Sequence, residues 1–235
     1  MTTKHTALIT GGSRGLGRAL TGALTARGWQ VVVDGRDSAA LGQVASQLPG
    51  VITLAGSVAD PAHLDALAAT VAGLGRLDLL VNNASELGPS PLPTLAEHPI
   101  DAWRAVYETN VVAPVGLLQR LLPLLRAAGG TVVDISSDAA VEAYPGWSGY
   151  GSAKAALDQL TAVLAVEEPR LHVYAVDPGD MRTELHQRAF PGEDISDRPL
   201  PADVVPDLLH LLDVAPPSGR YRARDRQRVE SGVPA

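Results

Sequence analysis

Short apolar runs alternate with helical stretches along almost the whole chain, and this alternation limits the possible folds more than any other feature. Runs with strand character fall at residues 7–10, 30–36, 51–54, 77–81, 131–135, 171–176 and, more weakly, 219–222. Strands that alternate with helices form a parallel sheet with helices on both faces. The 235 residues contain no linker and no internal repeat. We therefore expect one α/β domain, a doubly wound parallel sheet, over residues 1–235.

A glycine-rich turn between the first strand and the first helix indicates phosphate binding. Gly11, Gly15 and Gly17 follow the spacing Gly-x-x-x-Gly-x-Gly. Glycines let the backbone approach a phosphate, and the helix N-terminus adds free N–H groups and the positive end of a dipole. A plain glycine-rich loop is the alternative, since the spacing is not the literal Gly-x-Gly-x-x-Gly. The flanking strand and helix favour a Rossmann-type, dinucleotide-binding domain.

The end of the second strand carries both an acid and a base, Asp34 and Arg36. This is the position where a dinucleotide-binding unit contacts the adenosine ribose. An acid there accepts a hydrogen bond from a 2′-hydroxyl, whereas an arginine pairs with a 2′-phosphate. For Arg36, an ordinary solvated charge is the alternative.

A tyrosine and a lysine four residues apart, Tyr150 and Lys154, precede an alanine-rich helical run at residues 153–168. Positions i and i+4 share one helix face, so the phenol and the ammonium can reach the same small volume. A nearby positive charge favours the phenolate and lowers the pKa of the phenol. The pattern is a way to build a general acid–base group, although many helices carry such a pair as a surface feature.

Further polar or unusual residues follow the ends of other expected strands. They are Asn82, Asn83, Ala84 and Ser85, then Ser137, then Pro178 and Gly179. In open α/β sheets the ligand binds beyond the carboxyl ends of the strands. The co-location of these residues with the glycine turn predicts a single site there.

Composition excludes several other functions. The net charge of −7 argues against a nucleic-acid partner bound through a general basic surface. The absence of cysteine excludes thiol chemistry, and we expect no metal site. The N-terminal residues lack a signal-peptide pattern, and no apolar run approaches the length that spans a bilayer. We expect a soluble cytoplasmic protein without a membrane partner.

Taken together, these motifs resemble the classical short-chain dehydrogenase/reductase family over nearly the whole chain. Residues 10–17 resemble its cofactor turn, residues 82–84 its motif after strand four, and residues 178–183 its Pro-Gly stretch. Its catalytic tetrad is matched by Asn110, Ser137, Tyr150 and Lys154. Ser137 lies 13 residues before Tyr150 (150 − 137), and Asn110 lies 40 residues before Tyr150 (150 − 110).

The resemblance implies a role for each member of the tetrad. Ser137 would position the substrate oxygen, and Tyr150 would exchange a proton with it. Lys154 would lower the pKa of the phenol and hold the nicotinamide ribose, and Asn110 would hold a water that links Lys154 to solvent. The implied cofactor-binding residues are Gly11, Ser13, Arg14, Gly15, Leu16, Gly17, Arg36, Ser57, Val58, Asn83, Ala84, Tyr150, Lys154, Pro178, Gly179, Met181 and Thr183.

The resemblance also favours NADP over NAD. The acid that selects NAD in the family corresponds here to Gly35, and Arg36 stands one place later, where relatives that prefer NADP often carry a base. Arg14 is a second cation for the 2′-phosphate. Asp34 opposes this interpretation, because it would repel the phosphate if it turned inward.

Three residues depart from the family pattern. Ser57 stands where an aspartate often contacts the adenine, Ser85 replaces a glycine, and Asp138 places an acid next to Ser137. The departures leave the tetrad intact but make adenine affinity and pocket shape uncertain. The expected substrate lining comprises Leu87, Asp138, Tyr144, Trp147, Met181 and Phe190.

The leading interpretation is therefore an NADP-linked carbonyl reductase or alcohol dehydrogenase that acts on a small molecule. A non-catalytic dinucleotide sensor on the same fold is the alternative from another class, although a sensor needs no Tyr150–Lys154 pair. An epimerase or dehydratase of this architecture is usually longer. The apolar helices around residues 115–125 and 153–168 suggest a homodimer or homotetramer. Residues 184–200 are expected to form a mobile lid, and residues 225–235 a frayed polar tail.

Overall fold

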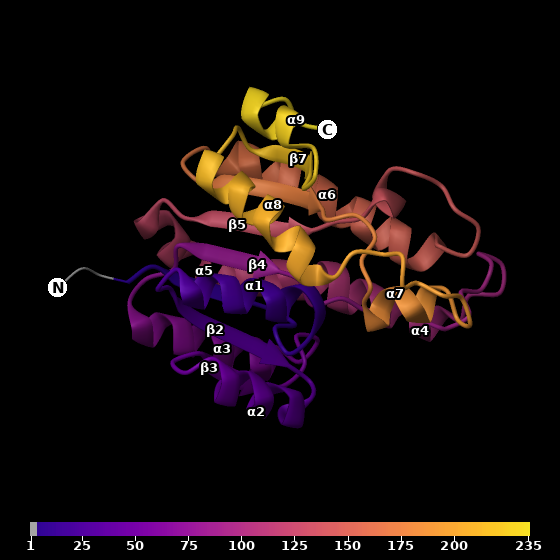
Figure 1. Ribbon diagram of the computed structural model, residues 1–235, viewed down its shortest axis with the longest axis horizontal. Helices are drawn as coiled ribbons and strands as arrows, with labels where there is room; N and C mark the ends of the chain where they lie inside the picture. The colour runs from indigo at the N-terminus through magenta and orange to yellow at the C-terminus, as the bar shows by residue number, and fades with distance from the viewer. Residues whose placement is uncertain (1–3) are drawn as a thin grey trace.

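Seven parallel strands form one sheet in the order β3-β2-β1-β4-β5-β6-β7 in the computed structural model, which describes residues 4–235 (Figure 1). The strands are β1 (Thr6–Ile9), β2 (Gln30–Gly35), β3 (Ile52–Ala55), β4 (Leu79–Asn82), β5 (Thr131–Ile135), β6 (His172–Asp177) and β7 (Gly219–Arg222). Every neighbouring pair is parallel. The predicted doubly wound α/β sheet is confirmed.

Helices cover both faces of the sheet because successive strand residues point to opposite sides. Ala7 and Ile9 pack into the core with α1 (Gly15–Ala26), α2 (Ser38–Gln47) and α8 (Pro201–Val214). Leu8 packs into the opposite core with α3 (Pro61–Leu74), α5 (Ala113–Ala128) and α6 (Ser148–Glu167). In Figure 1, α1 and α8 lie in front of the sheet, and α4 (Ile100–Tyr107) and α7 (Glu184–Ala189) lie together beyond its right-hand end.

The strand order reverses between β1 and β4, and the two strand ends are locked together there. The Thr10 hydroxyl oxygen accepts hydrogen bonds from the backbone N–H groups of Asn83 and Ala84, each at 3.0 Å. The Asn83 side-chain amide in turn donates to the carbonyl of Thr10 at 2.8 Å. This reversal opens the crevice in which α/β sheets bind their ligands.

The glycine turn fits into this reversal only because its glycines lack side chains. Gly11 has a φ of +67°, and a Cβ there would lie 2.9 Å from Cα of Ala84. At Gly17, in the first turn of α1, a Cβ would lie 2.5 Å from the Gly11 carbonyl oxygen and 2.6 Å from the Asn83 amide nitrogen. The turn and the end of β4 are therefore in direct backbone contact.

The helical region Ile100–Ala128 is continuous but not uniform. Helix α4 passes into a π-helical turn, η1 (Glu108–Val112), and then into α5. Pro114 falls in the first turn of α5, where proline is tolerated, and Pro123 lies inside the helix without ending it. By length and composition alone, Ile100–Ala128 would suffice to cross a membrane, a property shared by core helices of globular proteins.

The expected frayed tail at residues 225–235 is wrong. Helix α9 (Arg226–Ser231) is capped by Asp225, whose carboxylate accepts a hydrogen bond from the backbone N–H of Arg228 at 3.2 Å. Val229 is fully buried in the core beside α8. The C-terminal N–H of Ala235 donates to the Arg220 carbonyl at 2.6 Å. One apolar residue with a helix cap is enough to dock this polar segment.

Gly17 and Gly22 of α1 give a matched test of the packed turn. We expect Gly17→Ala to lower the free energy of unfolding by about 1–3 kcal/mol, because the new methyl group overlaps backbone atoms. A Cβ added at Gly22 would have its nearest neighbour, Cδ1 of Leu48, 4.0 Å away. Gly22→Ala should therefore raise stability by about 0.5–1 kcal/mol through helix propensity. Urea unfolding measures both; similar effects of the two substitutions would contradict the close packing.

Candidate active site

A cleft of about 950 Å³ runs across the carboxyl ends of the strands. It brings together nearly all of the residues predicted from the sequence, from the glycine turn to the Pro-Gly stretch. These are Gly11, Ser13, Arg14, Gly15, Leu16, Arg36, Ser57, Val58, Asn83, Ala84, Ser137, Tyr150, Lys154, Pro178, Gly179, Met181 and Thr183. Gly17 and Asn110 do not line the cleft. Of the expected substrate lining, Asp138, Trp147 and Met181 line it, whereas Leu87, Tyr144 and Phe190 do not.

Tyr150 and Lys154 both lie in α6 and face the same end of the cleft. Lys154 is almost completely buried, and its Nζ lies 5.4 Å from the centroid of the Tyr150 ring. The ammonium donates a hydrogen bond to the Ile135 carbonyl at 2.7 Å, at the end of β5. The two side chains therefore share one small volume, as their spacing predicts.

The electrostatics of this pair differ from the expectation. The pKa of Tyr150 is raised to about 12, mainly by burial and to a smaller extent by the negative charges of Asp177 and Asp138, while a hydrogen bond with Ser85 acts in the opposite direction. Burial also lowers the pKa of Lys154 to about 8. The predicted lowering of the phenol pKa by Lys154 is not met in this structure, because desolvation outweighs the attraction.

Ser137 follows β5 and caps the short helix η2 (Asp138–Ala140). Its hydroxyl donates to Oδ1 of Asp138 at 2.9 Å and accepts from the N–H of Ala139 at 3.2 Å. The Ser137 carbonyl accepts from the guanidinium of Arg220 in β7 at 2.9 Å. Both the side chain and the backbone of Ser137 are thus held in place.

Asn110 lies in the π-helical turn and is buried. Its side-chain oxygen accepts from the N–H of Glu86 at 2.8 Å and from the Ser85 hydroxyl at 3.2 Å, and its amide donates to the Glu86 carbonyl at 2.8 Å. The side chain therefore fixes the loop after β4 rather than lining the cleft.

At the opposite end of the cleft, Asp34 does not face the ribose position. Its carboxylate accepts from the N–H of Gly11 at 2.7 Å and pairs with His63 Nε2 at 3.0 Å. Asp34 is 1% exposed and His63 7%. The His63 ring fits only against a glycine, since a Cβ at Gly56 would lie 2.1 Å from its Nδ1. Asp34 is therefore a structural acid that joins the glycine turn to the wall formed by Ser57 and Val58.

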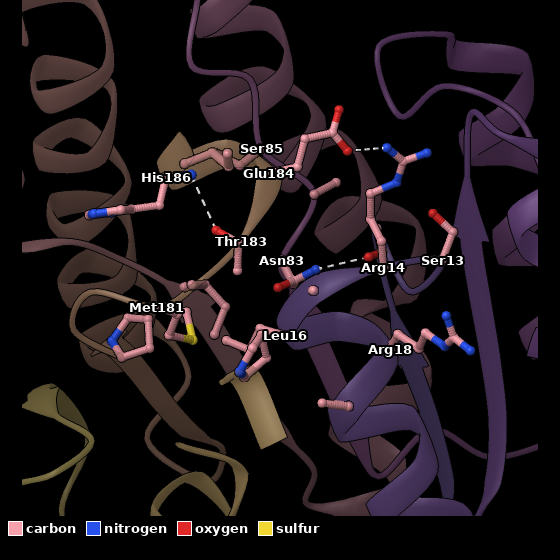
Figure 2. Close-up of a pocket in the computed structure, with 18 of the residues that line it drawn as sticks. Ser13, Arg14, Leu16, Arg18, Asn83, Ser85, Met181, Thr183, Glu184 and His186 are labelled. Atoms are coloured by element: carbon pink, nitrogen blue, oxygen red, sulfur yellow. Dashed lines mark hydrogen bonds and ion pairs between the residues drawn. The ribbon is translucent and has the colours of Figure 1, made fainter. Parts of the chain in front are cut away.

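Arg14 and Arg36 surround the position expected for a 2′-phosphate. Arg14 pairs with Asp37 at 2.8 Å and with Glu184 of α7, as Figure 2 shows. Arg36 is largely exposed and lies 3.4 Å from a carboxylate oxygen of Glu86. Both guanidiniums line the cleft. The acid partners of Arg14 are exposed and Arg36 is itself largely exposed, so an anionic ligand can compete for both.

The lining fits a dinucleotide. Helix α1 starts at the glycine turn, and its N-cap residue Arg14 makes no side-chain cap hydrogen bond. The first N–H groups of α1 are therefore available to a pyrophosphate. Thr183 stands nearby, with its methyl carbon 3.7 Å from where a Cβ of Gly15 would lie. Within residues 4–235, no group of three or more His, Cys, Asp or Glu side chains could hold a metal ion.

The expected lid region, residues 184–200, begins with the short helix α7, which is docked over the cleft. The Arg188 guanidinium donates to the Gly88 carbonyl at 2.8 Å and contacts Glu86 at 3.3 Å. The Arg188 carbonyl accepts from the Ser90 hydroxyl at 2.6 Å. The first residues of α7, Glu184 and His186, face the cleft in Figure 2.

Sequence reasoning missed an ion-pair network beneath the site. Arg220 Nε donates to Asp158 of α6 at 2.9 Å, and its Nη2 lies 3.7 Å from Asp177 at the end of β6. Arg220 and Asp158 are each only 14% exposed. The sequence of β7, a polar strand of four residues, does not indicate this role, because the partners of Arg220 are distant in the sequence. Asp34–His63 was missed for the same reason.

Comparison with known proteins gives a consistent picture. A family model described as short chain dehydrogenase matches residues 5–194. The chain is 30% identical to an uncharacterised oxidoreductase of Saccharomyces cerevisiae, over 96% of this chain and 91% of the relative. It is 35% identical to L-xylulose reductase of Bos taurus, over 78% of this chain and 75% of the relative. The structure of a short chain dehydrogenase from Shigella flexneri complexed with NADP superimposes on this chain with a TM-score of 0.87. The two are 30% identical, and the match covers 94% of this chain and 97% of that one.

The buried network generates a stability prediction. Arg220→Gln should lower the free energy of unfolding by about 2–4 kcal/mol, since it leaves Asp158 without its partner and Asp177 with only the half-exposed Arg222. Arg222→Gln is the matched control, because Arg222 is half exposed and only 3.8 Å from Asp177; its effect should stay below about 1 kcal/mol. Adding Asp158→Asn to Arg220→Gln should recover part of the loss. Equal effects of the two single substitutions in chemical unfolding would refute the network.

Proposed function

The chain belongs to the short-chain dehydrogenase family of oxidoreductases, and we propose that it transfers a hydride between NADP and a small carbonyl or alcohol substrate. One observation carries the proposal. A single cleft joins Tyr150, Lys154 and Ser137 at one end to the glycine turn at the other. A hydride-transfer enzyme needs this arrangement, because the nicotinamide must lie next to the group that exchanges the proton.

The residues divide the chemistry with the cofactor. When bound, the nicotinamide supplies or accepts the hydride. Ser137 hydrogen-bonds to the substrate oxygen and fixes its position, and Tyr150 gives that oxygen a proton in reduction or removes it in oxidation. Lys154 orients the nicotinamide ribose and places a positive charge beside the phenol. With its pKa near 12, Tyr150 carries its proton at neutral pH, which suits donation to a carbonyl.

Tyr150→Phe tests the chemistry directly. The variant keeps the ring, which packs edge-on against Trp147 at 5.7 Å, but loses the exchangeable proton. Turnover should fall at least about 10²–10⁴-fold, while NADPH binding measured by fluorescence titration stays nearly intact. Tyr107→Phe is the control, because Tyr107 stacks on Trp103 away from the cleft. Near-normal turnover of Tyr150→Phe would overturn the mechanism.

The alternative of a non-catalytic dinucleotide sensor makes a different prediction in the same experiment. A sensor binds the cofactor but shows no turnover with any carbonyl or alcohol, so Tyr150→Phe would change nothing. Burial of the Lys154 ammonium beside Tyr150 disfavours this alternative, since a buried charge is expensive to keep without a function.

Several observations support NADP over NAD. Arg14 and Arg36 both reach the ribose end of the cleft. Asp34 points away toward Gly11 and His63, so it presents no acid to a 2′-phosphate. At Gly35 a Cβ would lie 2.8 Å from the Ser13 hydroxyl oxygen, which leaves no room there for the acid that selects NAD.

Arg36→Ala tests the choice of cofactor. A charge-assisted contact to the phosphate contributes about 1.5–3 kcal/mol, so the dissociation constant for NADPH should rise about tenfold or more. The constant for NADH should change little. Arg104→Ala, which removes an exposed arginine paired with Asp101, controls for the loss of net charge. An equal loss of affinity for both cofactors would show that Arg36 does not contact the phosphate.

We further propose a cytoplasmic homodimer or homotetramer, without nucleic-acid or membrane partners. Helix α6 leaves Leu160, Val163 and Val166 exposed, the last at 82%, and Val112 is half exposed before α5. An apolar helix face that does not pack on its own sheet is suited to pairing with another copy. A monomer in sedimentation velocity at micromolar concentration would contradict this assembly.

Residues 184–200 are proposed to act as a lid that reorders over the substrate. The polar contacts of α7 with the rest of the chain, through Arg14, Glu86 and Gly88, lie at or near the surface. Its apolar contacts are few, with Ala189 packed in a small cluster and Phe190 against Trp147. Polar contacts at the surface exchange readily. Hydrogen exchange in this segment that cofactor and substrate leave unchanged would contradict the proposal.

A further inference from the structure

Asp138 is the one carboxylate at the substrate end of the cleft that has no cationic partner within 4.0 Å among residues 4–235. The other acids that line the cleft there are paired: Asp177 with Arg220 and Arg222, Asp180 with Arg198, and Glu184 with Arg14. Asp138 instead accepts only from neutral donors, which are the hydroxyls of Ser137 and Tyr144 and the N–H of Ala139.

The charge of Asp138 is felt across the site. Burial is the main cause of the raised pKa of Tyr150 and of Asp177, and the hydrogen bond with Glu142 is the main cause at Tyr144; the charge of Asp138 adds to the rise at all three. The carboxylate is half-buried and lines the cleft. An acid that is partly desolvated and unpaired leaves a negative potential, which a cation bound in the cleft would neutralise.

Asp138 also lies at a defined distance from the reacting atoms. Its Oδ1 is 2.9 Å from Oγ of Ser137, the hydroxyl that positions the substrate oxygen. A substituent on the carbon next to the reacting carbon is a close neighbour of that oxygen. A protonated amine at this carbon can therefore contact Asp138 while the oxygen contacts Ser137.

Such an amine would also change what Ser137 can do. The hydroxyl has a single proton, and it donates that proton to Asp138. An ammonium group that binds Asp138 offers the carboxylate a stronger, charge-assisted donor. Ser137 is then free to turn its proton toward the substrate oxygen.

The aromatic side chains beside Asp138 suit the same ligand. Trp147 lies edge-on to Tyr150 at 5.7 Å and to Tyr144 at 6.4 Å, and it is tilted against Phe190 at 6.0 Å. Aromatic faces attract cations when water is excluded. The Arg188 guanidinium in the cleft wall already has an acid partner in Glu86.

We propose that Asp138 selects a substrate that carries a protonated amine on the carbon next to the alcohol or carbonyl carbon, that is, a vicinal amino alcohol or amino ketone. The proposal rests on the proposed oxidoreductase function and names the substrate class for the same site.

A matched panel tests it with NADP at the nicotinamide absorbance. The panel is 1-amino-2-propanol, 1,2-propanediol and lactate, which place an ammonium, a hydroxyl and a carboxylate next to the same secondary alcohol. A charged contact of about 1.5–3 kcal/mol predicts that kcat/KM for the amino alcohol exceeds that for the diol by about 10–100-fold. Lactate should be the poorest substrate.

Substitutions separate Asp138 from a general charge effect. In Asp138→Asn, the ratio of kcat/KM between amino alcohol and diol should fall to near one. Glu142→Gln removes the same charge from a half-exposed side chain that also contacts Tyr144, and it should leave the ratio unchanged. An amino alcohol no better than the diol, or a ratio that survives Asp138→Asn, would overturn the proposal.

A binding measurement keeps the test independent of turnover. 1-Amino-2-methyl-2-propanol has no hydrogen on its carbinol carbon and cannot be oxidised to a ketone. 2-Methyl-2-butanol, in which a methyl group replaces the ammonium, is its neutral counterpart and is equally inert. Calorimetry on the enzyme–NADP complex should show tighter binding of the amine in the wild type and equal binding in Asp138→Asn. Absence of turnover with every alcohol and carbonyl would refute the oxidoreductase function, whereas equal binding of the two analogues in the wild type would refute the role of Asp138 alone.

Discussion

The close approach of the glycine turn to the end of β4 is the constraint on which the rest of the structure depends. Neither Gly11 nor Gly17 has room for a Cβ, and Thr10 and Asn83 hold the two strand ends together. Because β1 and β4 are neighbours at the point where the strand order reverses, fixing them also fixes both halves of the crevice. The buried Asp34–His63 pair extends this fixed unit toward β3 and the adenosine end.

The catalytic end is held by a different kind of interaction. Charged hydrogen bonds of buried side chains, rather than close backbone packing, hold this end. Lys154 donates to the Ile135 carbonyl. Arg220 donates to the Ser137 carbonyl and pairs with Asp158 and Asp177. Charged hydrogen bonds of this kind position groups precisely, because breaking any one leaves a charge unpaired. The strand that provides Arg220 lies beyond the region that the family model matches.

The sequence predicted the element order and the location of the site because both depend on local patterns. The alternation of strands and helices determines the parallel sheet, and the parallel sheet places all strand ends at one edge. Local patterns failed where a glycine or a charge serves a distant contact. Helix α6 starts at Ser148, before the expected residue 153, because Gly149 and Gly151 allow close packing on His98 and Ala139 instead of breaking the helix. Arg220, His63 and Val229 have partners that no window of neighbouring residues contains.

The same desolvation that buries Tyr150 and Lys154 acts on them in opposite directions. It raises the pKa of the phenol to about 12 and lowers that of the ammonium to about 8, so each side chain is pushed toward its neutral form. Two acids, Asp177 and Asp138, then add to the rise at Tyr150, but only Asp177 has arginine partners. A cation bound at Asp138 removes the unbalanced part of this effect and makes the phenolate easier to form. In the proposed mechanism, substrate charge and proton transfer are therefore linked at Asp138, whose carboxylate accepts a hydrogen bond from Ser137.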